Sequence, residues 1–552
     1  MPRKSTLWKS LIPSPRAFLI LKTLDPLTLL SAILVILAFP PWNFSFLVWV
    51  AWVPWFFALN RAQTLKQSVV QGVWLNFLMS LGVFHWVAGT LAEFGNLPLI
   101  VGVFGLLLFC LVGQPQFILF AWLQRLLVHP HVNRAEGKTR PQLLVILSLC
   151  AGFMYVGLDW ICPKIFMDTM GHALWNAQYI RQAADLGGAA LLTFLIFLVN
   201  DAIYFALRGS TFKRVAIQKV ILALSLCTVF CVYGFYRLHQ VQQILAQTSN
   251  GVQVAAIQAN IGDFEKVAAE KGVGRAAHQI LDSYSELTRE SMRSERKPQL
   301  IVWPETAYPT TFGRPHSHTE NELELRMKAL IQEIQIPLLF GGYDTSKGKD
   351  FNTFFFLTPQ EKLTAYHKSI LLIFGEYIPG ADSIAWLRNS FPQVGNFGRG
   401  AGPEVVSIPY LDRQGREQTL KVAPAICYEA LFPNFAIESA RQGSQAIFNI
   451  TNDGWFGGWA EPQLHLALST FRSIETRLPL FRSTNTGISA LVLPDGEIPA
   501  ATAIDSRTVM STWIPLAAPI PTLMKAWGDW FGPLGLILGA LGLFLSRRFF
   551  HS

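Results

Sequence analysis

Long apolar segments dominate the first part of this chain and then largely stop. They recur between short polar breaks as far as about Gln240, whereas the sequence from Asn250 to about Arg507 carries ordinary charged and amphipathic segments. The whole chain is 51% hydrophobic and only 15% charged, and it holds 41 Phe and 17 Trp. Such a composition is too apolar for a single soluble globular protein. We therefore expect a membrane part followed by a soluble part.

A helix that spans a bilayer needs about 20 apolar residues. Apolar segments of roughly this size predict eight spans, namely Leu27–Phe39, Phe44–Leu59, Val69–Leu91, Pro98–Leu127, Leu143–Ile161, Gly187–Leu207, Val220–Leu238 and a last one near Trp530–Leu545. The fourth is expected to kink at Gly113-Gln114-Pro115, because proline removes a backbone donor and clashes with the preceding turn. The predicted domains are residues 1–249 in the membrane, 250–515 as a soluble catalytic domain, and 516–552 as a final span with a basic tail.

Lysine and arginine gather in alternate loops between the predicted spans. The residues are Arg3, Lys4, Lys9, Arg16, Arg61, Lys66, Arg134, Lys138, Arg140, Arg208, Lys213, Arg214, Lys219, Arg547 and Arg548. The positive-inside rule places these loops and both termini in the cytoplasm, and the soluble part on the other side. The net charge of +9 then reflects topology and does not indicate a nucleic-acid partner. The first apolar segment lacks a small-residue cleavage site after it, so we expect a retained anchor.

Cys427 is the only cysteine of the soluble part, because the other five fall in or at the end of predicted spans. It has no partner there for a disulfide, and an unpaired thiol outside the cytoplasm is a liability unless it has a use. The segment Lys421–Pro433 around it reads as a strand, a thiol and a short helix. A thiol at the positive end of a helix dipole is expected to have a lowered pKa. Cys427 is therefore a candidate nucleophile.

Two charged residues in apolar surroundings precede this cysteine. They are Glu305, after Leu300–Pro304, and Lys368, before Ser369–Gly375. A base, a cation and a thiol are the components of an acyl-transfer enzyme. Strand-like and helix-like segments alternate through the soluble part, which predicts an α/β layered domain. All three residues fall at strand ends, and that edge of an α/β sheet is where sites form.

Six short motifs resemble the nitrilase or carbon-nitrogen hydrolase superfamily, and more closely the apolipoprotein N-acyltransferases, membrane proteins that carry such a domain. They occur in the order of that family and are Gln258–Ile261, Trp303–Thr306, Tyr366–Lys368 with Phe374–Tyr377, Ile426–Glu429, Thr451–Gly457 and Arg482–Gly487. The resemblance implies an α-β-β-α sandwich outside the inner membrane of a bacterium, in the periplasm. No cysteine and histidine cluster has metal-ligand spacing and no glycine-rich phosphate loop appears in the sequence, so we expect neither a metal nor a cofactor.

The resemblance also implies roles for residues. Glu305 would be the general base, Lys368 the cation that stabilises the oxyanion, and Cys427 the nucleophile. Supporting residues would be Glu376, Tyr428 and Glu429, and substrate-binding residues would be Asn452, Trp455 and Phe456.

In the implied reaction, Cys427 takes an acyl chain from a phospholipid such as phosphatidylethanolamine. The thioester then passes the chain to the α-amino group of an N-terminal diacylglyceryl-cysteine of a lipoprotein. Both substrates reside in the bilayer, which would explain why the catalytic domain is tied to membrane spans.

The chain departs from the family pattern at two positions. Val267 follows Lys266 where the family commonly has tryptophan, and Ile373 stands where it commonly has proline. Both departures are expected to alter acyl or headgroup preference and to leave the triad intact.

Structural interpretations compete with several of these roles. A lone cysteine at a strand end is usually a small buried hydrophobe, and a carboxylate after Trp-Pro can cap a helix. Glu376 and Glu429 could act directly or only hold a lysine by an ion pair. Trp455 and Phe456 could form a lipid-facing loop or belong to the core.

Two other functions compete with acyl transfer to a lipoprotein. A membrane-tethered amidase or nitrilase would share the triad and send the thioester to water. A transporter or receptor would use the soluble domain only for binding. Transport would require paired charges within the membrane, for which the sequence offers only Asp159 and Asp201 at the ends of predicted spans as candidates. Acylation of Cys427 by phospholipid would separate the three.

Overall fold

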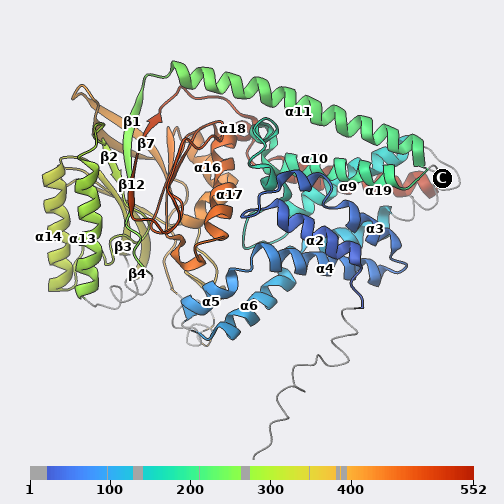
Figure 1. Cartoon of the computed structure of the whole chain (residues 1–552), viewed down its shortest axis with the longest axis horizontal. Coiled ribbons are helices and arrows are strands. Elements are labelled where there is room, and N and C mark those ends of the chain that lie inside the picture. The colour runs from blue at the N-terminus through green and yellow to red at the C-terminus, as the bar shows by residue number, and fades with distance from the viewer. Residues whose placement is uncertain are drawn as a thin grey trace, which may run out of the picture.

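The computed structural model describes residues 22–95, 97–128, 141–209, 212–262, 274–346, 348–380, 384, 386 and 395–551. Figure 1 shows helices gathered at one end of the molecule and two β-sheets at the other. The 35-residue helix α11 (Lys213–Gln247) runs along the helical end and leads directly into the first strand. Residues 263–273, which include Lys266 and Val267, lie outside the described part.

The helical end is built from apolar helices of very different lengths. They are α2 (Pro26–Ala38), α3 (Val53–Arg61), α4 (Leu65–Val83), α5 (Val87–Gly95), α6 (Leu99–Val112), α7 (Gln116–Leu123), α9 (Pro141–Ile161), α10 (Ala184–Leu207), α11 and α19 (Phe531–His551). Between α6 and α7 the helix is interrupted at Gly113-Gln114-Pro115, where the sequence predicts a kink. Apolar side chains of α6 and α11 are exposed, Ile100 by 72% and Leu224 by 62%, as lipid-facing surfaces require.

The helices of the membrane part do not correspond one to one with the eight predicted spans. Within the described residues, four helices are long and apolar enough to cross a membrane, or five if the bent pair of α4 and α5 is one span. The second predicted span is broken into a 3-10 turn (Ser45–Trp49) and the nine-residue α3. The third bends by 62° between α4 and α5. The hydrophobicity of a segment predicts that it lies in the membrane. It does not show where the packing of side chains interrupts the helix.

The other end is a sandwich of two six-stranded sheets. The first sheet has the order β12-β1-β2-β3-β4-β5 and the second β11-β10-β9-β8-β7-β6. In chain order the strands are β1 (Gly251–Gln258), β2 (Leu300–Val302), β3 (Leu338–Ser346), β4 (Lys349–Leu357), β5 (Leu363–His367), β6 (Val406–Leu411), β7 (Glu417–Ile426), β8 (Ala446–Thr451), β9 (Leu480–Thr484), β10 (Ala490–Val492), β11 (Ala500–Ala501) and β12 (Thr508–Pro515). β1, β2 and β3 run parallel, as do β7, β8 and β9.

Helices cover the outer face of each sheet. Alternate residues of β1 point to opposite faces, so Ala255 and Ile257 pack against α13 (Gly274–Ser291) and α14 (His318–Ile334), while Val254 faces the second sheet. The second sheet is covered by α16 (Pro433–Arg441) and α17 (Glu461–Thr476), which lie between it and the membrane helices (Figure 1). The α-β-β-α architecture predicted from the sequence is confirmed.

The two ends of the molecule share one buried core. A continuous hydrophobic cluster extends from the membrane helices through α17 into the second sheet. At the junction, Arg477 after α17 donates to Asp185 of α10 at 2.7 Å, and Arg237 of α11 donates to the same carboxylate at 2.7 Å. The sheets begin at Gly251 and end at Pro515. The exact domain limits stay a prediction, because no break in packing separates the parts.

Candidate active site

Glu305 lies just after β2 at the carboxyl end of the first sheet, with only 6% of its surface exposed. Its Oε1 accepts hydrogen bonds from Lys368 Nζ at 3.3 Å and Asn352 Nδ2 at 2.7 Å. Its Oε2 accepts the backbone N–H of Asn452 at 3.0 Å. A glycine at position 341 is required here, since a Cβ on Gly341 would lie 2.6 Å from Glu305 Cα. Groups from both sheets therefore hold the carboxylate in place.

Lys368 follows β5, and its ammonium group is buried between two carboxylates. Nζ lies 2.8 Å from Glu376 Oε1 and 3.3 Å from Glu305 Oε1. Burial lowers the pKa of Lys368, but Glu305, Glu376 and the nearby Cys427 outweigh it and raise the pKa well above its usual value. The lysine is therefore a permanent cation, suited to stabilise a developing negative charge.

Cys427 directly follows β7 and has a left-handed backbone conformation, with φ of 50°. Its carbonyl accepts a hydrogen bond from Asn449 Nδ2 at 3.4 Å. Burial, and next to it the charge of Glu305, raises the pKa of the thiol well above its usual value, against the opposing effects of Lys368 and Thr451.

The expected lowering of the Cys427 pKa by a helix dipole is therefore wrong. The helix that begins at Cys427 is a five-residue 3-10 turn (Cys427–Leu431), so its dipole is small. Burial beside a carboxylate dominates instead. The thiol is therefore protonated at rest, and it would act as a nucleophile only if a base removed its proton during attack.

The structure brings the three predicted catalytic residues together from three separate strand ends. Lys368 bonds directly to Glu305, and both groups influence the ionisation of Cys427. Of the supporting residues, Glu376 is held against Lys368 and also accepts the backbone N–H of Leu372 at 2.8 Å. Glu376 thus contacts the site directly.

Glu429 has a different position from Glu376. It accepts the backbone N–H groups of Ser369 at 2.7 Å and Ile426 at 2.8 Å, and the hydroxyl of Tyr366 at 2.8 Å. Burial raises its pKa, and these hydrogen bonds oppose the rise. The carboxylate ties the loop after Lys368 to the turn that carries the nucleophile.

Tyr428 points away from the triad and toward the membrane helices. Its hydroxyl donates to the carbonyl of Ile165, and its ring lies 6.5 Å from that of Phe166. Both residues belong to the loop between α9 and α10. Tyr428 therefore links the nucleophile turn to the membrane part.

The predicted substrate-binding segment lies between the triad and α5. Asn452 donates its backbone N–H to Glu305, and Phe456 is 8% exposed with its ring 5.4 Å from Trp86. Trp455 is half-buried against the core. Phe456 therefore belongs to the core and not to a lipid-facing loop. The aromatic side chain of this region that is exposed is that of Trp459, at 52%.

Comparison with known proteins agrees with this geometry. The apolipoprotein N-acyltransferase N-terminal domain model matches residues 31–202, and the carbon-nitrogen hydrolase model matches residues 253–519. The apolipoprotein N-acyltransferase of Bdellovibrio bacteriovorus is 31% identical over 530 residues, which cover 93% of this chain and 92% of the relative. The chain belongs to the apolipoprotein N-acyltransferase family. The family member of Geobacter metallireducens is 28% identical, over 88% of each chain.

A solved structure of the nitrilase superfamily is also similar. Saccharomyces cerevisiae Nit3, a member of branch 10 of the superfamily, shows 17% identity and a TM-score of 0.35, and the match covers 49% of this chain and 91% of that chain. The apolar helices together with the family membership identify this N-acyltransferase-family chain as a membrane protein.

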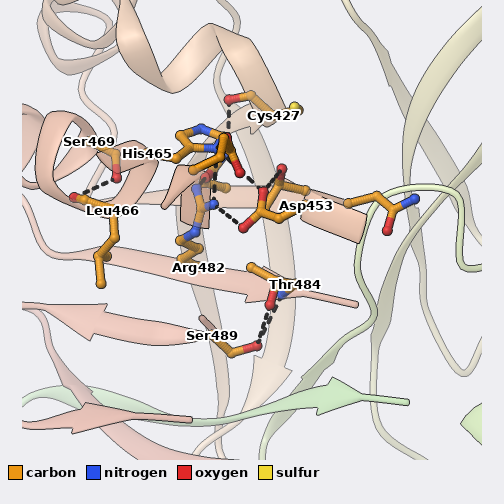
Figure 2. A network of polar contacts seen from close by, with 12 residues as sticks. Cys427, Asp453, His465, Leu466, Ser469, Arg482, Thr484 and Ser489 are labelled. Atoms are coloured by element: carbon orange, nitrogen blue, oxygen red, sulfur yellow. Dashed lines mark hydrogen bonds and ion pairs between the residues drawn. The ribbon is translucent and has the colours of Figure 1, made fainter. Parts of the chain in front are cut away.

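This family member also carries a buried cluster that resembles a metal site. Asp453, Glu461 and His465 place ligand atoms within 4.8 Å of one another, the single such group among the described residues. Arg482 already occupies the cluster, donating to Asp453 Oδ2 at 2.7 Å and lying 3.1 Å from His465 Nδ1 (Figure 2). A metal ion at this place would sit beside a guanidinium cation, so these residues fit an ion-pair network and not a metal.

Two of the residues that hold the site were not foreseen from the sequence. Asn352 is a lone amide within the aromatic strand β4 and bonds both Glu305 and Glu376. A polar residue among Phe351 and Phe354–Phe356 is a signal that could have identified it. The other is Thr451, whose hydroxyl lowers the pKa of the Cys427 thiol; nothing in the sequence assigns that effect to it.

Proposed function

We propose that this chain has the activity of its family and transfers an acyl chain from a phospholipid to the N-terminus of a lipoprotein. The observation that carries the proposal is the buried contact of Glu305 and Lys368 beside the Cys427 thiol. The acceptor is the α-amino group of an N-terminal diacylglyceryl-cysteine, and phosphatidylethanolamine is the proposed donor.

In the first step Glu305 removes the proton of the Cys427 thiol as the sulfur attacks the ester carbonyl of the phospholipid. The carbonyl oxygen becomes an oxyanion, which the cationic Lys368 stabilises. When the tetrahedral intermediate collapses, the ester C–O bond breaks and Glu305 returns the proton to the leaving oxygen. The products are a thioester on Cys427 and a lysophospholipid.

In the second step the lipoprotein amine attacks the thioester carbonyl. Glu305 takes a proton from the attacking nitrogen, and Lys368 again stabilises the oxyanion. The C–S bond breaks, and the proton on Glu305 returns to the departing sulfur. An amide forms and the Cys427 thiol is regenerated, so Glu305 serves as base and acid in turn.

Transfer to an amine, in preference to hydrolysis, requires that the thioester be shielded from water. Cys427 and Lys368 are 6% and 2% exposed, which supports such shielding. Phe456 and Tyr428 join this site to the membrane part through Trp86 and Phe166. A hydrolase that shares the triad is the competing candidate.

The proposed reaction is tested by intact-mass analysis of the purified protein in detergent. Incubation with phosphatidylethanolamine and no acceptor is expected to add one acyl mass to the wild type and none to Cys427→Ala. Cys162→Ala, which removes a buried cysteine outside the site, is the matched control and is expected to be acylated. A lipopeptide with a free diacylglyceryl-cysteine should then remove the adduct.

The other outcomes separate the alternatives. Release of free fatty acid without a stable adduct would indicate the hydrolase. An adduct with phosphatidylglycerol but not with phosphatidylethanolamine would reject the proposed donor alone. Absence of any adduct on the wild type would contradict acyl transfer altogether.

We also propose that the protein lies in the bacterial inner membrane, with both termini in the cytoplasm and the catalytic domain in the periplasm. The charge of the loops supports this orientation. The test uses single cysteines introduced into a Cys-less variant at Lys349, which is exposed on β4, and at Arg61, which is exposed at the end of α3. A membrane-impermeant maleimide added to spheroplasts is expected to label the first and not the second, and the reverse pattern would contradict the orientation.

A further inference from the structure

Asn352 of β4 lies inside the site and has one polar atom that the resting site does not use. Its Nδ2 donates to Glu305 Oε1 at 2.7 Å and to Glu376 Oε1 at 2.9 Å. Its Oδ1 is buried and has no hydrogen-bond partner among the residues that the structure describes. Folded proteins rarely leave a buried acceptor without a donor, because the desolvation of that acceptor is then not compensated. The unpaired oxygen therefore requires an explanation.

The orientation of this amide is fixed by its neighbours. An ionised carboxylate can only accept hydrogen bonds. If the amide were turned by 180°, its oxygen would face the carboxylate oxygens of Glu305 and Glu376 with no proton between them. The backbone holds the residue from the other side, because the Asn352 carbonyl accepts the N–H of Lys368 at 2.9 Å. Nδ2 must therefore face the two carboxylates, and Oδ1 must face away from them.

The strand places the side chain of Asn352 in the space between the two sheets. Side chains alternate along a strand, so Asn352 lies on the same face of β4 as Phe354 and Phe356. Both of these residues belong to the buried cluster that also contains Cys427, whereas Phe355 packs against the outer helices. The amide and the nucleophile therefore lie in the same layer of the sandwich.

The unpaired oxygen is close to the base. Because Nδ2 and Oδ1 belong to one planar amide, Oδ1 lies within about 5 Å of Glu305 Oε1. A nitrogen that donates to two oxygens, at about 2.9 Å each, can bridge such a separation. The attacking amine of the second step is a nitrogen of this kind, since one of its protons goes to Glu305 and another N–H still needs an acceptor. The reacting ester of the first step has no N–H or O–H group.

The burial of Oδ1 matches the closed state of the whole site. Cys427 and Lys368 are also almost completely covered. A substrate that reaches the sulfur has to displace the side chains that cover the site. The same displacement gives the amine access to the space in front of the base.

We propose that Asn352 is a further catalytic residue, whose Oδ1 accepts one N–H of the attacking amine while Glu305 takes another proton. The proposal rests on the acyl-transfer function proposed above. The nitrogen lone pair forms the C–N bond with the thioester carbonyl, the C–S bond breaks, and the sulfur receives the proton from Glu305. The N–H that Asn352 holds stays on the nitrogen and becomes the N–H of the product amide.

The experiment measures two rates by intact mass in the full-length protein in detergent. The first is the gain of an acyl group from phosphatidylethanolamine, and the second is its loss after a lipopeptide with a free diacylglyceryl-cysteine is added. Asn352→Ala removes Nδ2, which holds Glu305 in both steps, and Oδ1, which serves only the second. Both steps should therefore slow, and the second should slow about tenfold more than the first, as the loss of one further hydrogen bond predicts.

Two other substitutions of Asn352 separate its oxygen from its nitrogen. Asn352→Asp keeps an acceptor oxygen at this place, so both rates should fall but their ratio should stay near the wild-type value. Asn352→Ser provides a second test of the loss of the amide oxygen if the alanine variant does not fold. Its shorter side chain should change the ratio of the two rates in the same direction as alanine does.

Thr353→Val is the matched control on the same strand. Thr353 is fully buried on the opposite face of β4, and its hydroxyl donates to the Phe351 carbonyl. Both rates of this variant are expected to equal those of the wild type.

The remaining outcomes would overturn the proposal. Equal slowing of both steps by Asn352→Ala would leave Asn352 only as a support of Glu305. A changed ratio in Thr353→Val would show that distortion of β4 explains the effect. A wild type that forms no adduct, or that keeps its adduct in the presence of the lipopeptide, would refute the proposed function itself and this inference with it.

Discussion

The two outer helix layers of the sandwich differ sharply, although both cover a six-stranded sheet. α13 and α14 keep a charged face in solvent, where Arg289 and Glu333 pair at 2.8 Å with about half of each side chain exposed. α17 is buried at every residue but Gln463, and its charges are paired inside the protein. The comparison shows that the second layer belongs to both parts of the molecule, because Arg477 at the end of α17 pairs with Asp185 of the membrane part.

Breaking the junction should have the largest effect on stability. Arg477→Met removes the guanidinium that pairs with Asp185 at 2.7 Å, and both side chains are at most 1% exposed. Loss of one partner of a buried pair typically costs 3–5 kcal/mol, here about 3 kcal/mol because Arg237 still pairs with Asp185. Thermal unfolding in detergent measures it, and a change under 1 kcal/mol would contradict the interpretation of α17 as the joining layer.

The pH dependence of stability should distinguish the two layers next. Burial raises the pKa of Glu475 in α17 from 4.5 to about 7, against the opposing effect of Arg472. The folded state then binds the proton more tightly than the unfolded chain. The contribution of this group to the free energy of unfolding is complete below pH 4.5 and is lost as the pH rises through 7, by about 3 kcal/mol.

Glu475→Gln should remove this contribution to the change of the free energy of unfolding with pH between pH 5 and 8. Glu461 of the same helix, whose pKa burial likewise raises, should keep its own contribution. Glu333 on the solvent side behaves oppositely, because its hydrogen bond with Arg289 lowers its pKa and so favours folding at higher pH. If the free energy of unfolding of Glu475→Gln changes with pH as steeply as that of the wild type, Glu475 does not titrate in this range.

A smaller effect is expected where the nucleophile turn meets the membrane part. Tyr428→Phe deletes the hydroxyl that bonds the Ile165 carbonyl, which should lower the free energy of unfolding by about 1 kcal/mol. Acylation of Cys427 should remain within a few-fold of the wild type, since the hydroxyl does not face the triad. A loss of acylation above a hundredfold would instead give Tyr428 a chemical role.

The smallest effect is expected on the solvent-facing layer. Arg289→Ala breaks an exposed ion pair, and such pairs contribute about 0–1 kcal/mol. It serves as the matched control for Arg477→Met in the same unfolding measurement. If Arg289→Ala and Arg477→Met lower the free energy of unfolding by the same amount, the proposed difference between the two helix layers is wrong.

Local sequence predicted an α/β layered domain and candidate residues at strand ends, and the resemblance to the family predicted the sandwich. The strands around Leu300–Val302 and Ala446–Thr451 are short apolar runs bounded by turns, so periodicity and breakers define them without knowledge of the fold. Glu305, Lys368 and Cys427 each follow such a run, and strand ends gather at one edge of a sheet. These signals depend on neighbours in the chain.

The features that the sequence did not predict depend on neighbours in space. The rise in the Cys427 pKa comes from burial beside Glu305, a residue more than a hundred positions away in the chain. The spans broken at Trp49–Val53 and Val83–Val87 look continuous in hydropathy. Arg482 lies in an apolar strand, and only the fold shows that Asn449 and Asp453 meet its two ends.

The protonated state of the resting Cys427 has a practical meaning for inhibitors. Simple electrophiles react with thiolates, so they should react slowly with the protonated Cys427 thiol. Thiols of other proteins that are more ionised should be modified first. An effective covalent inhibitor must occupy the acyl site and present its electrophile where Glu305 takes the proton as the bond forms. The inhibitor would then be selective because it reacts only where Glu305 deprotonates the thiol. Lipid-like electrophiles should therefore inactivate the enzyme faster than small polar electrophiles.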